Sequence, residues 1–132
     1  MQKQLQSILI VEDEEDIIEI LRIALSINSN FHLIFARSGK EGLDRAKLEA
    51  PDLILIDVLM PGMNGLTLSE ELKKEDKTKQ IPIIFITSRV QKNEILEYKA
   101  KGAIGVIEKP FAPMEIVTKI RGFWGEVSTL LY

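Results

Sequence analysis

The sequence of 132 residues contains no cysteine, and this absence excludes several kinds of site at once. Without a thiol there is no disulfide, no thiolate ligand for a metal and no cysteine nucleophile. Histidine is almost absent as well, since His32 is the only one in the sequence. A lone histidine has no companion with which to form a metal site or a catalytic pair, so we expect His32 to be structural.

Long apolar runs and a strong net charge are also missing. No run approaches the roughly 20 apolar residues of a membrane-spanning helix, and no signal-peptide core follows the polar residues 1–4. The formal net charge of −3 argues against a domain that binds DNA by neutralising its phosphates. We therefore expect one soluble, cytoplasmic domain without a membrane or nucleic-acid partner.

Five short apolar runs are predicted to be strands. The runs are Ser7–Val11, Phe31–Ala36, Leu53–Ile56, Pro82–Ile86 and Ala103–Ile107. Four of them lack polar alternation, which is typical of strands that are buried on both faces of a parallel sheet. The second run contains His32, which indicates a place nearer the edge of the sheet.

The segments between and after these runs show the apolar spacing of helices. Their recurring apolar positions are Ile17, Ile20, Leu21 and Ala24, then Leu43, Ala46 and Ala50, then Leu68 and Leu72, and finally Ile116, Val117, Ile120, Phe123 and Trp124. The expected boundaries are Ser38-Gly39 and Pro51 for the second helix, Asn64-Gly65 for the third, Lys92 to Lys101 with Gly102 as a cap for the fourth, and Pro113 for the fifth. Strictly alternating strands and helices predict an α/β fold, a flavodoxin-like, doubly wound five-stranded parallel sheet in the order 2-1-3-4-5 with five helices.

Polar residues follow four of the predicted strands at their carboxyl ends. Glu12 and Asp13 follow the first strand, Asp57 the third, Thr87 the fourth and Lys109 the fifth. Open α/β sheets bind their ligands at this edge. In the order 2-1-3-4-5 the first and third strands are neighbours, so we expect the three carboxylates in one small volume, with Thr87 and Lys109 at its rim.

Three carboxylates this close repel one another, so either some keep their protons or a cation is bound. Only oxygen ligands are available to the cluster, which favours a hard cation such as Mg²⁺. A carboxylate can attack phosphorus to form an aspartyl phosphate if the charge on the transferring oxygens is neutralised, here by the metal and Lys109. Asp57 is the best candidate for the nucleophile, because it ends the central apolar run and enters a constrained turn.

Each of these residues has an ordinary structural explanation when it is taken alone. A strand-end aspartate often forms a turn, and acidic residues such as Glu12 and Asp13 favour the start of a helix. Thr87 is a common residue at a strand end, and Lys109 a common surface charge. The functional hypothesis therefore depends on four strand ends meeting at one place.

Four motifs surround these residues, and in this order they resemble the receiver domains of response regulators in two-component signalling. The motifs are ILIVEDEEDI, LILIDVLMPGMNGL, IIFITS and GAIGVIEKPF. The resemblance extends from about Ser7 to Trp124, and in layout the chain is similar to the single-domain chemotaxis regulators. Residues 7–124 are accordingly expected to form the receiver domain, and residues 125–132 a C-terminal tail or the start of a linker.

The resemblance implies a role for each residue of the site. Asp57 is expected to accept the phosphoryl group from a histidine kinase or a histidine phosphotransfer protein, and Thr87 and Lys109 to contact its oxygens. The expected ligands of Mg²⁺ are Asp13, Asp57, the backbone carbonyl of Leu59 and, mainly through water, Glu12. The Lys109-Pro110 peptide is expected to be cis. A downstream protein is expected to dock on the fourth helix, fifth strand and fifth helix. No separate substrate is turned over, so the chain is not expected to be an enzyme.

Several positions depart from the commonest pattern of the family. The position three before Lys109 usually holds an aromatic residue that turns inward on activation, and here it is Val106. A valine cannot act in this way, so the coupling to Thr87 needs another explanation. Glu12 replaces an aspartate and should alter the water-mediated contact only slightly. An apolar Leu59 beside the nucleophile is expected to slow the attack of water.

Tyr98 and the C-terminal residues are assigned from the pattern alone. Tyr98 is expected to be an ordinary half-exposed aromatic residue on the fourth helix, and a contact with a partner is the alternative. Val127 and Leu130 or Leu131 continue the spacing that ends at Trp124. This apolar tail is expected to extend the helix and pack back, to form a dimer seam, or to begin a linker.

Other interpretations of the same residues compete with the phosphorylatable receiver. A pseudo-receiver would keep the fold and signal without phosphorylation, and only Val106 favours it. Phosphatases of the haloacid dehalogenase type generally carry a second acid two residues after the nucleophile, where this chain has Leu59. A flavodoxin-like FMN carrier needs a phosphate loop after the first strand, where the acidic residues 12–15 would repel phosphate.

Overall fold

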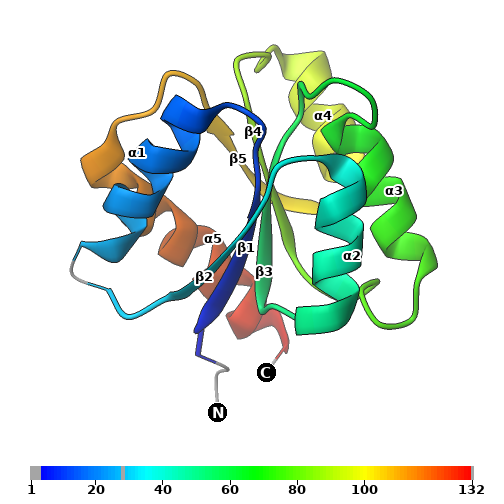
Figure 1. Ribbon diagram of the computed structural model, residues 1–132, viewed down its shortest axis with the longest axis horizontal. Coiled ribbons are helices and arrows are strands. Elements are labelled where there is room, and N and C mark those ends of the chain that lie inside the picture. The colour runs from blue at the N-terminus through cyan, green and yellow to red at the C-terminus, as the bar shows by residue number, and fades with distance from the viewer. Residues whose placement is uncertain (1–3, 28, 132) are drawn as a thin grey trace.

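The computed structural model describes residues 4–27 and 29–131, in which strands and helices alternate along the chain (Figure 1). The strands are β1 (Ser7–Val11), β2 (His32–Ala36), β3 (Leu53–Asp57), β4 (Ile83–Thr87) and β5 (Ala103–Glu108). The helices are α1 (Glu15–Ser26), α2 (Gly39–Glu49), α3 (Gly65–Lys74), α4 (Lys92–Ala100) and α5 (Ile116–Leu131), with a 3₁₀ turn at Pro113–Glu115. The predicted alternation is confirmed.

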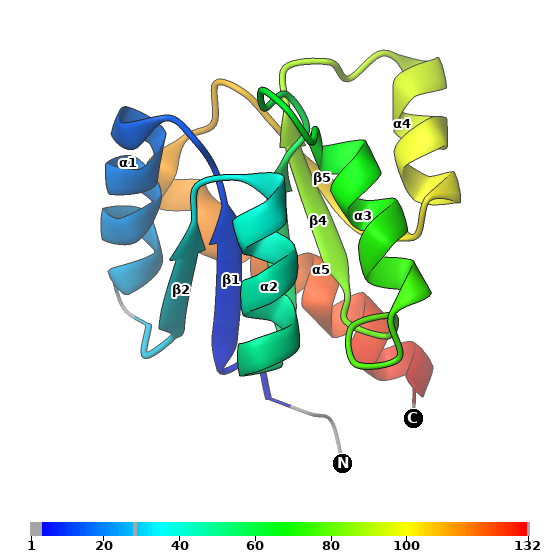
Figure 2. The same ribbon diagram turned by 45° about the vertical axis from the view of Figure 1, so that its right-hand side comes forward.

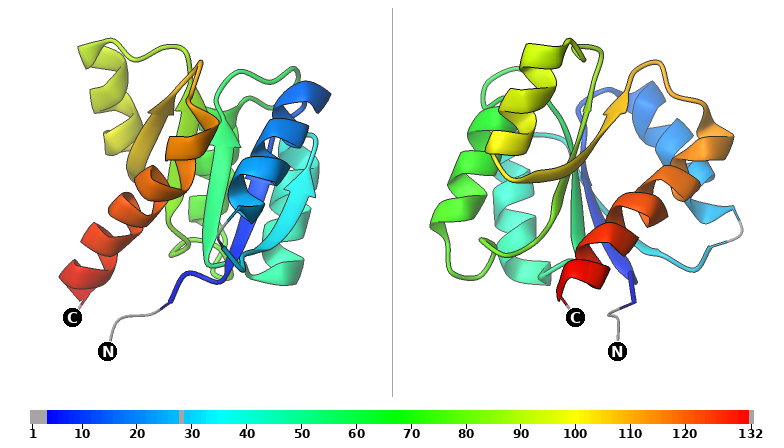
Figure 3. Two further views of the ribbon diagram at one scale, coloured as in Figure 1. Left: turned by 90° about the vertical axis from the view of Figure 1, so that its left-hand side faces the viewer. Right: turned by 180° about the vertical axis from the view of Figure 1, so that it is seen from behind.

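The strands form one parallel sheet in the order β2-β1-β3-β4-β5, which confirms the predicted flavodoxin-like topology. Helices cover both faces: α1 and α5 lie on one side, and α2, α3 and α4 on the other (Figure 1, Figure 2). The start of β1 and the end of α5 lie at the same end of the sheet (Figure 3). The connections that leave the strands all lie at the opposite, carboxyl edge.

The apolar residues of the strands are shared between two cores, one on each face of the sheet. In β1, Leu9 packs with residues of α2, α3 and α4, whereas Ile8 and Ile10 pack with residues of α1 and α5. Every residue of β3 and β4 is buried. Burial on both faces explains why these strands are continuous apolar runs in the sequence. β2 lies at the edge of the sheet, as predicted, and His32 at its start is exposed.

Several strands differ by one residue from the apolar runs that predict them, although Asp57 and Thr87 end β3 and β4 as expected. Asp57 is the last residue of β3 and Thr87 the last of β4, although the apolar runs end one residue earlier. Both continue the ladder, because Asp57 pairs with Ile86 and Thr87 with Glu108. β4 also begins one residue later than its apolar run. An apolar pattern cannot detect a polar residue that belongs to the ladder, so it ends the strand too early.

The helix ends follow the predicted caps with two differences. Ser38 and Asn64 cap α2 and α3, each accepting a backbone N–H on its side-chain oxygen. Gly102 follows α4 with a φ of 93°, in the left-handed region that favours glycine. Ala50 was wrongly assigned to the apolar face of α2: it is the exposed C-cap, with a φ of 47°. Pro113 opens the 3₁₀ turn and not α5 itself.

α5 continues past Trp124 to Leu131, so the tail extends the helix. The side chains of residues 126–131 and the whole of Tyr132 lie outside the described residues. Packing back of the tail, a dimer seam, a linker and the domain boundary at residue 124 all stay predictions. Among the helices that the structure describes, none has both the length and the apolarity to cross a membrane.

Candidate functional site

The predicted site lies at the carboxyl edge of the sheet, where β1, β3 and β5 end. Val11 pairs with Ile56 in the parallel ladder, so the residues that follow, Glu12 and Asp57, leave neighbouring strands at the same level. Lys109 directly follows β5, and its Nζ contacts Glu12 although 97 residues separate the two in sequence. The register of the sheet thus assembles residues that are far apart in the chain.

Three carboxylates meet at this place. One oxygen from each of Glu12, Asp13 and Asp57 lies within 4.8 Å of the other two. Glu12 is 1% exposed and Asp57 is 2% exposed, so little water is left to screen their repulsion. The structure therefore brings together the three acids that the strand order predicts.

Lys109 supplies the positive charge of the cluster. Its Nζ lies 3.3 Å from Glu12 Oε1, to which it donates a hydrogen bond, and 3.3 Å from Asp57 Oδ2. Burial by itself lowers the pKa of Lys109, but the negative charges of Glu12 and Asp57 outweigh it and raise the pKa above its ordinary value. Lys109 therefore remains an ammonium ion beside the acids. The peptide between Lys109 and Pro110 is cis, as predicted.

Glu12 is the acid whose protonation the site changes most. Desolvation of the buried side chain, together with the negative charge of Asp57, raises the pKa of Glu12 from 4.5 to about 7. The backbone N–H of Glu14 donates to Glu12 Oε2 at 3.1 Å and, with Lys109, opposes this rise. Near neutral pH, a proton or a cation therefore lowers the free energy of the cluster.

Two buried oxygens of the cluster, Asp13 Oδ1 and Asp57 Oδ2, receive no hydrogen bond from the part of the chain that the structure describes. The approach of Lys109 to Asp57 Oδ2 is a contact between charges without hydrogen-bond geometry. Buried polar atoms rarely stay without a partner. A divalent cation is a partner that suits carboxylate oxygens, so this cluster fits a metal ion.

Two further predicted residues flank the acids. Thr87 is buried at the end of β4, and its Oγ1 accepts a hydrogen bond of 3.0 Å from the backbone N–H of Arg89. Leu59 donates its own N–H to Asp57 Oδ1 at 3.2 Å, and its side chain is 50% exposed. The hydroxyl of Thr87 is therefore tied to the loop after β4, whereas Leu59 stands beside the nucleophile candidate with its side chain in water.

The sequence as a whole decides the family. A model of the response regulator receiver domain matches residues 8–121. The chain belongs to the response regulator receiver domain family. Receiver domains are signalling modules of two-component systems and do not turn over a separate substrate as enzymes do.

Relatives and solved structures agree with this assignment. The receiver is 31% identical to the polar-differentiation response regulator DivK of Brucella anthropi, over 92% of this chain and 98% of DivK. It is 32% identical to the phosphate regulon transcriptional regulatory protein PhoB of Escherichia coli, over 93% of this chain and 53% of PhoB. The chain thus spans about half the length of that regulator. The structure of the Vibrio cholerae chemotaxis protein CheY4 superposes with a TM-score of 0.83 at 27% identity, covering 91% of this chain and 99% of CheY4.

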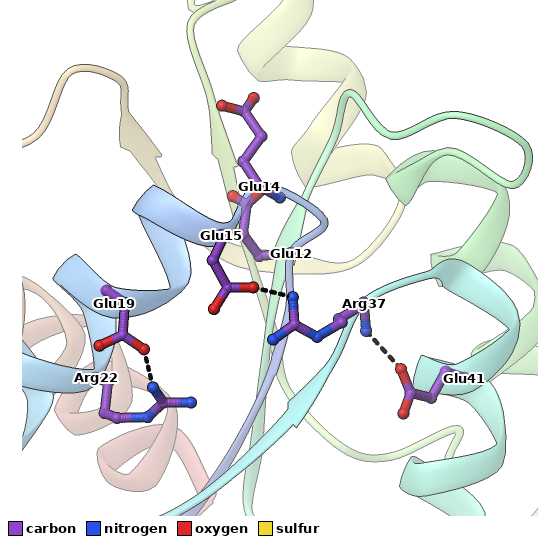
Figure 4. Close-up of polar contacts among 7 residues, drawn as sticks. All are labelled: Glu12, Glu14, Glu15, Glu19, Arg22, Arg37 and Glu41. Atoms are coloured by element: carbon purple, nitrogen blue, oxygen red, sulfur yellow. Dashed lines mark hydrogen bonds and ion pairs between the residues drawn. The ribbon is translucent and has the colours of Figure 1, made fainter.

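The receiver has ion pairs at the rim of the site that the sequence pattern did not reveal (Figure 4). Arg37, directly after β2, donates a hydrogen bond to Glu15 at the start of α1, and its backbone N–H donates to Glu41 of α2 at 2.7 Å. The hydrogen bond with Arg37 lowers the pKa of Glu15 and raises that of Arg37. Glu15 therefore ties α1 to the end of β2, a contact over 22 residues that no local charge pattern indicates.

Tyr98 is not the half-exposed aromatic residue that the sequence predicted. It is 2% exposed, its ring centroid lies 5.4 Å from that of Phe85, and its hydroxyl donates to the carbonyl of Arg89 at 2.9 Å. Val106 packs against the same core cluster. The apolar residues of α4 do not fall on one clear stripe, so periodicity could not show which face of this receiver helix is buried.

Proposed function

We propose that this receiver accepts a phosphoryl group on Asp57 from a phosphohistidine donor, in a reaction that depends on Mg²⁺. The observation that carries the proposal is the setting of Asp57 Oδ2. This oxygen is buried, lies 3.3 Å from Lys109 Nζ, and has no hydrogen bond from any described residue. A carboxylate oxygen in this setting keeps its lone pairs for attack on phosphorus, whereas a purely structural aspartate uses them in turns and caps.

The proposed transfer is an in-line displacement at phosphorus. The Asp57 oxygen forms a bond to phosphorus while the bond from phosphorus to the imidazole nitrogen of the donor breaks. The bonding electrons leave with the imidazole, which takes up a proton. The Lys109 ammonium faces the oxygens of the transferred group, and the Thr87 hydroxyl donates to one of them after it turns from the loop. Hydrolysis of the acyl phosphate by water returns the carboxylate and ends the signal.

The acidic cluster is the proposed site of Mg²⁺. The proposed ligands are Asp13, Asp57, the Leu59 carbonyl and, through water, Glu12. When bound, the ion supplies positive charge that neutralises the oxygens of the phosphoryl group. The buried oxygen Asp13 Oδ1 supports this assignment, because no described residue donates a hydrogen bond to it. The raised pKa of Glu12 supports it as well, since burial and the negative charge of Asp57 both disfavour the carboxylate, and a bound cation would offset both effects.

The proposed partners are proteins on either side of the phosphotransfer. A histidine kinase or a histidine phosphotransfer protein is the proposed donor, and a downstream protein that docks on α4, β5 and α5 is the proposed output. A second copy of the chain, paired along α5, is the alternative partner on that face. The names of DivK and PhoB describe regulators of differentiation and of transcription, which supports a signalling output without defining the target.

The alternative function is that of a pseudo-receiver, an interaction module that signals without phosphorylation. Val106 favours this alternative, because it replaces the aromatic residue that the family commonly uses in switching. The complete acidic cluster and Lys109 oppose it, because a pure interaction module has no use for buried carboxylates that repel one another.

Intact mass after incubation with Mg²⁺ and acetyl phosphate tests the proposal. The parent protein should gain one phosphoryl group, and Asp57→Asn should gain none. Chelation of the metal should abolish the adduct in the parent. Asp76→Asn is a matched control, since it neutralises a carboxylate that is 94% exposed and outside the cluster, and it should be phosphorylated like the parent. A parent that forms no adduct and binds no beryllofluoride would instead support the pseudo-receiver.

A further inference from the structure

Arg89, in the loop between β4 and α4, is hydrogen-bonded through both of its backbone groups. Its N–H donates to Thr87 Oγ1 at 3.0 Å, and its carbonyl accepts from the Tyr98 hydroxyl at 2.9 Å. Thr87 belongs to the proposed phosphoryl site, whereas Tyr98 belongs to α4. One loop residue therefore connects the site with the helix through two consecutive hydrogen bonds.

Tyr98 is held firmly at the other end of this connection. Its side chain is 2% exposed, and its ring is tilted by 55° against Phe85 at a centroid distance of 5.4 Å. Phe85 of β4 pairs with Val106 of β5; Phe85 and Tyr98 belong to one core cluster, and the partly buried Val106 packs against it. Tyr98 therefore supplies, from α4, the buried ring and hydroxyl that Val106 cannot supply from β5.

We propose that Tyr98 is the positioning residue that couples α4 to the phosphoryl site of this chain, in place of an aromatic residue at position 106. Its hydroxyl holds the loop in the arrangement in which Thr87 is bonded to Arg89, and it releases the loop when Thr87 turns to the phosphoryl group. This inference rests on the proposed phosphorylation of Asp57 and adds the route by which α4 responds to it.

The backbone around Thr87 limits how its hydroxyl can turn. The carbonyl of Thr87 accepts a hydrogen bond of 2.9 Å from the N–H of Lys109, which fixes the main chain at the end of β4. The hydroxyl must therefore turn by rotation of its side chain, which breaks or shifts the bond with Arg89. The loop has room to follow, because an open depression of about 380 Å³ is lined by Ser88, Arg89, Val90, Gln91 and Glu94.

The test compares Tyr98→Phe with the parent protein in the binding of beryllofluoride in the presence of Mg²⁺. Phenylalanine keeps the packing against Phe85 and removes only the hydroxyl, so the variant should fold. Loss of a hydrogen bond of this kind shifts the equilibrium between the two loop arrangements by a factor of about 2 to 10. Release of the loop raises the population of the arrangement that can bind the analogue. The variant should therefore bind beryllofluoride about 2 to 10 times more tightly than the parent.

A second readout does not depend on the bound analogue. In the unphosphorylated protein, the amide of Arg89 should exchange its hydrogen faster in Tyr98→Phe than in the parent, by a similar factor. Thr78→Val is the matched control. Thr78 is buried and its hydroxyl donates to the carbonyl of Leu72 at 2.6 Å, in the segment that precedes β4 at the far edge of the sheet. This variant should lose stability and leave both the analogue affinity and the exchange of Arg89 unchanged.

The outcomes separate this inference from the proposed function. If the parent binds beryllofluoride and Tyr98→Phe binds it equally or more weakly, the coupling role of Tyr98 is wrong while phosphorylation stands. The same holds if Thr78→Val changes the affinity as much as Tyr98→Phe does, because general loss of stability then explains the effect. If the parent binds no beryllofluoride, the proposed function fails and the coupling fails with it.

Discussion

Glu12 follows β1 and Asp57 ends the neighbouring strand β3, and their burial gives each a property that its residue type alone does not have. The pKa of Glu12 is raised to about 7, so this side chain is partly protonated near neutral pH. Asp57 has one oxygen that accepts no hydrogen bond from a described residue and lies next to the ammonium group of Lys109. Both properties depend on side chains from other strands. At the scale of the residue, the chemistry of this receiver therefore depends on one buried cluster, in which the pKa values of Glu12 and Lys109 are raised.

The raised pKa of Glu12 gives a pH dependence of stability with a defined sign. Without metal, Glu12 ionises near pH 4.5 in the unfolded chain but only near pH 7 in the folded one. Its contribution to the free energy of unfolding is therefore fully present below pH 4.5 and is lost as the pH rises through 7, by on the order of 3 kcal/mol. Urea unfolding in a chelator, from pH 4 to 8, should show this loss in the parent. Glu12→Gln cannot ionise at this position, so a parallel decline in that variant would contradict the assignment.

Leu59 offers a test of how the site controls hydrolysis. Its side chain is 50% exposed and follows Asp57 by two residues, so an amide at this position can hold a water near the acyl phosphate. Leu59→Asn should shorten the lifetime of the phosphorylated protein severalfold, measured by the decay of the phosphoryl adduct in intact mass. Leu48→Asn is the matched control, because Leu48 is 80% exposed on α2 and should leave the lifetime unchanged. Equal lifetimes in all three proteins would show that Leu59 does not restrict water.

At the scale of the element, the junction of β3 and α3 places the nucleophile candidate. α3 begins at Gly65, which lies so close to β3 that a Cβ there would be 2.5 Å from the carbonyl oxygen of Asp57 and 2.8 Å from Cα of Val58. The backbone N–H of Gly65 donates to the carbonyl of Val58 at 2.9 Å. The short connection thus packs the helix start directly against the end of the strand, and only a residue without a side chain fits.

Gly65→Ala should therefore damage both the fold and the site. Two of the atoms that the new methyl group would meet belong to the backbone, so relief requires β3 and α3 to separate, at a cost of about 1–3 kcal/mol. Gly122→Ala is the control, because Gly122 lies in α5 and its Cβ position has no described atom within 4 Å apart from its chain neighbours and the backbone of its own helix. Alanine should stabilise that helix by up to about 1 kcal/mol. Thermal unfolding of both variants measures the difference. A Gly65→Ala variant as stable as the parent would show that the junction is loose.

At the scale of the whole molecule, the site joins segments from most of the chain. The acids come from the ends of β1 and β3, Lys109 comes from the end of β5, and the two cores hold these strands in register. Anything that neutralises the cluster should therefore stabilise the entire fold, since ligands that bind only the folded state shift the unfolding equilibrium.

Mg²⁺ is expected to stabilise the protein as a whole. At about 100 times its dissociation constant a ligand adds about 2.7 kcal/mol, which raises the melting temperature of a domain of this size by roughly 10 °C. Asp13→Asn should remove most of this increase, whereas Asp76→Asn at an exposed position should keep it. The measurement is a thermal melt over a series of Mg²⁺ concentrations at constant ionic strength. An equal increase in all three proteins would indicate screening by salt and not a bound ion.

The sequence by itself determined the elements, their order and the place of the acids. Continuous apolar runs distinguished strands buried on both faces, and strand ends such as Asp57 and Thr87 could be assigned because the carboxyl ends of parallel strands meet at one edge. These signals are local or follow from topology. They were sufficient to predict the cluster of Glu12, Asp13 and Asp57, but they carry no information on which face of a short helix is buried.

Only the tertiary structure decided how the side chains pair across the molecule. Two contacts show this: the Tyr98 hydroxyl donates to the Arg89 carbonyl, and Arg37 donates to Glu15. Each contact, like the burial of Tyr98, joins segments that no spacing pattern in the sequence places close together. The pKa of Glu12 also belongs to this level, because desolvation and the charge of a neighbour exist only after the strands are in register. Periodicity predicts which residues can face a core, whereas packing determines which partners they meet there.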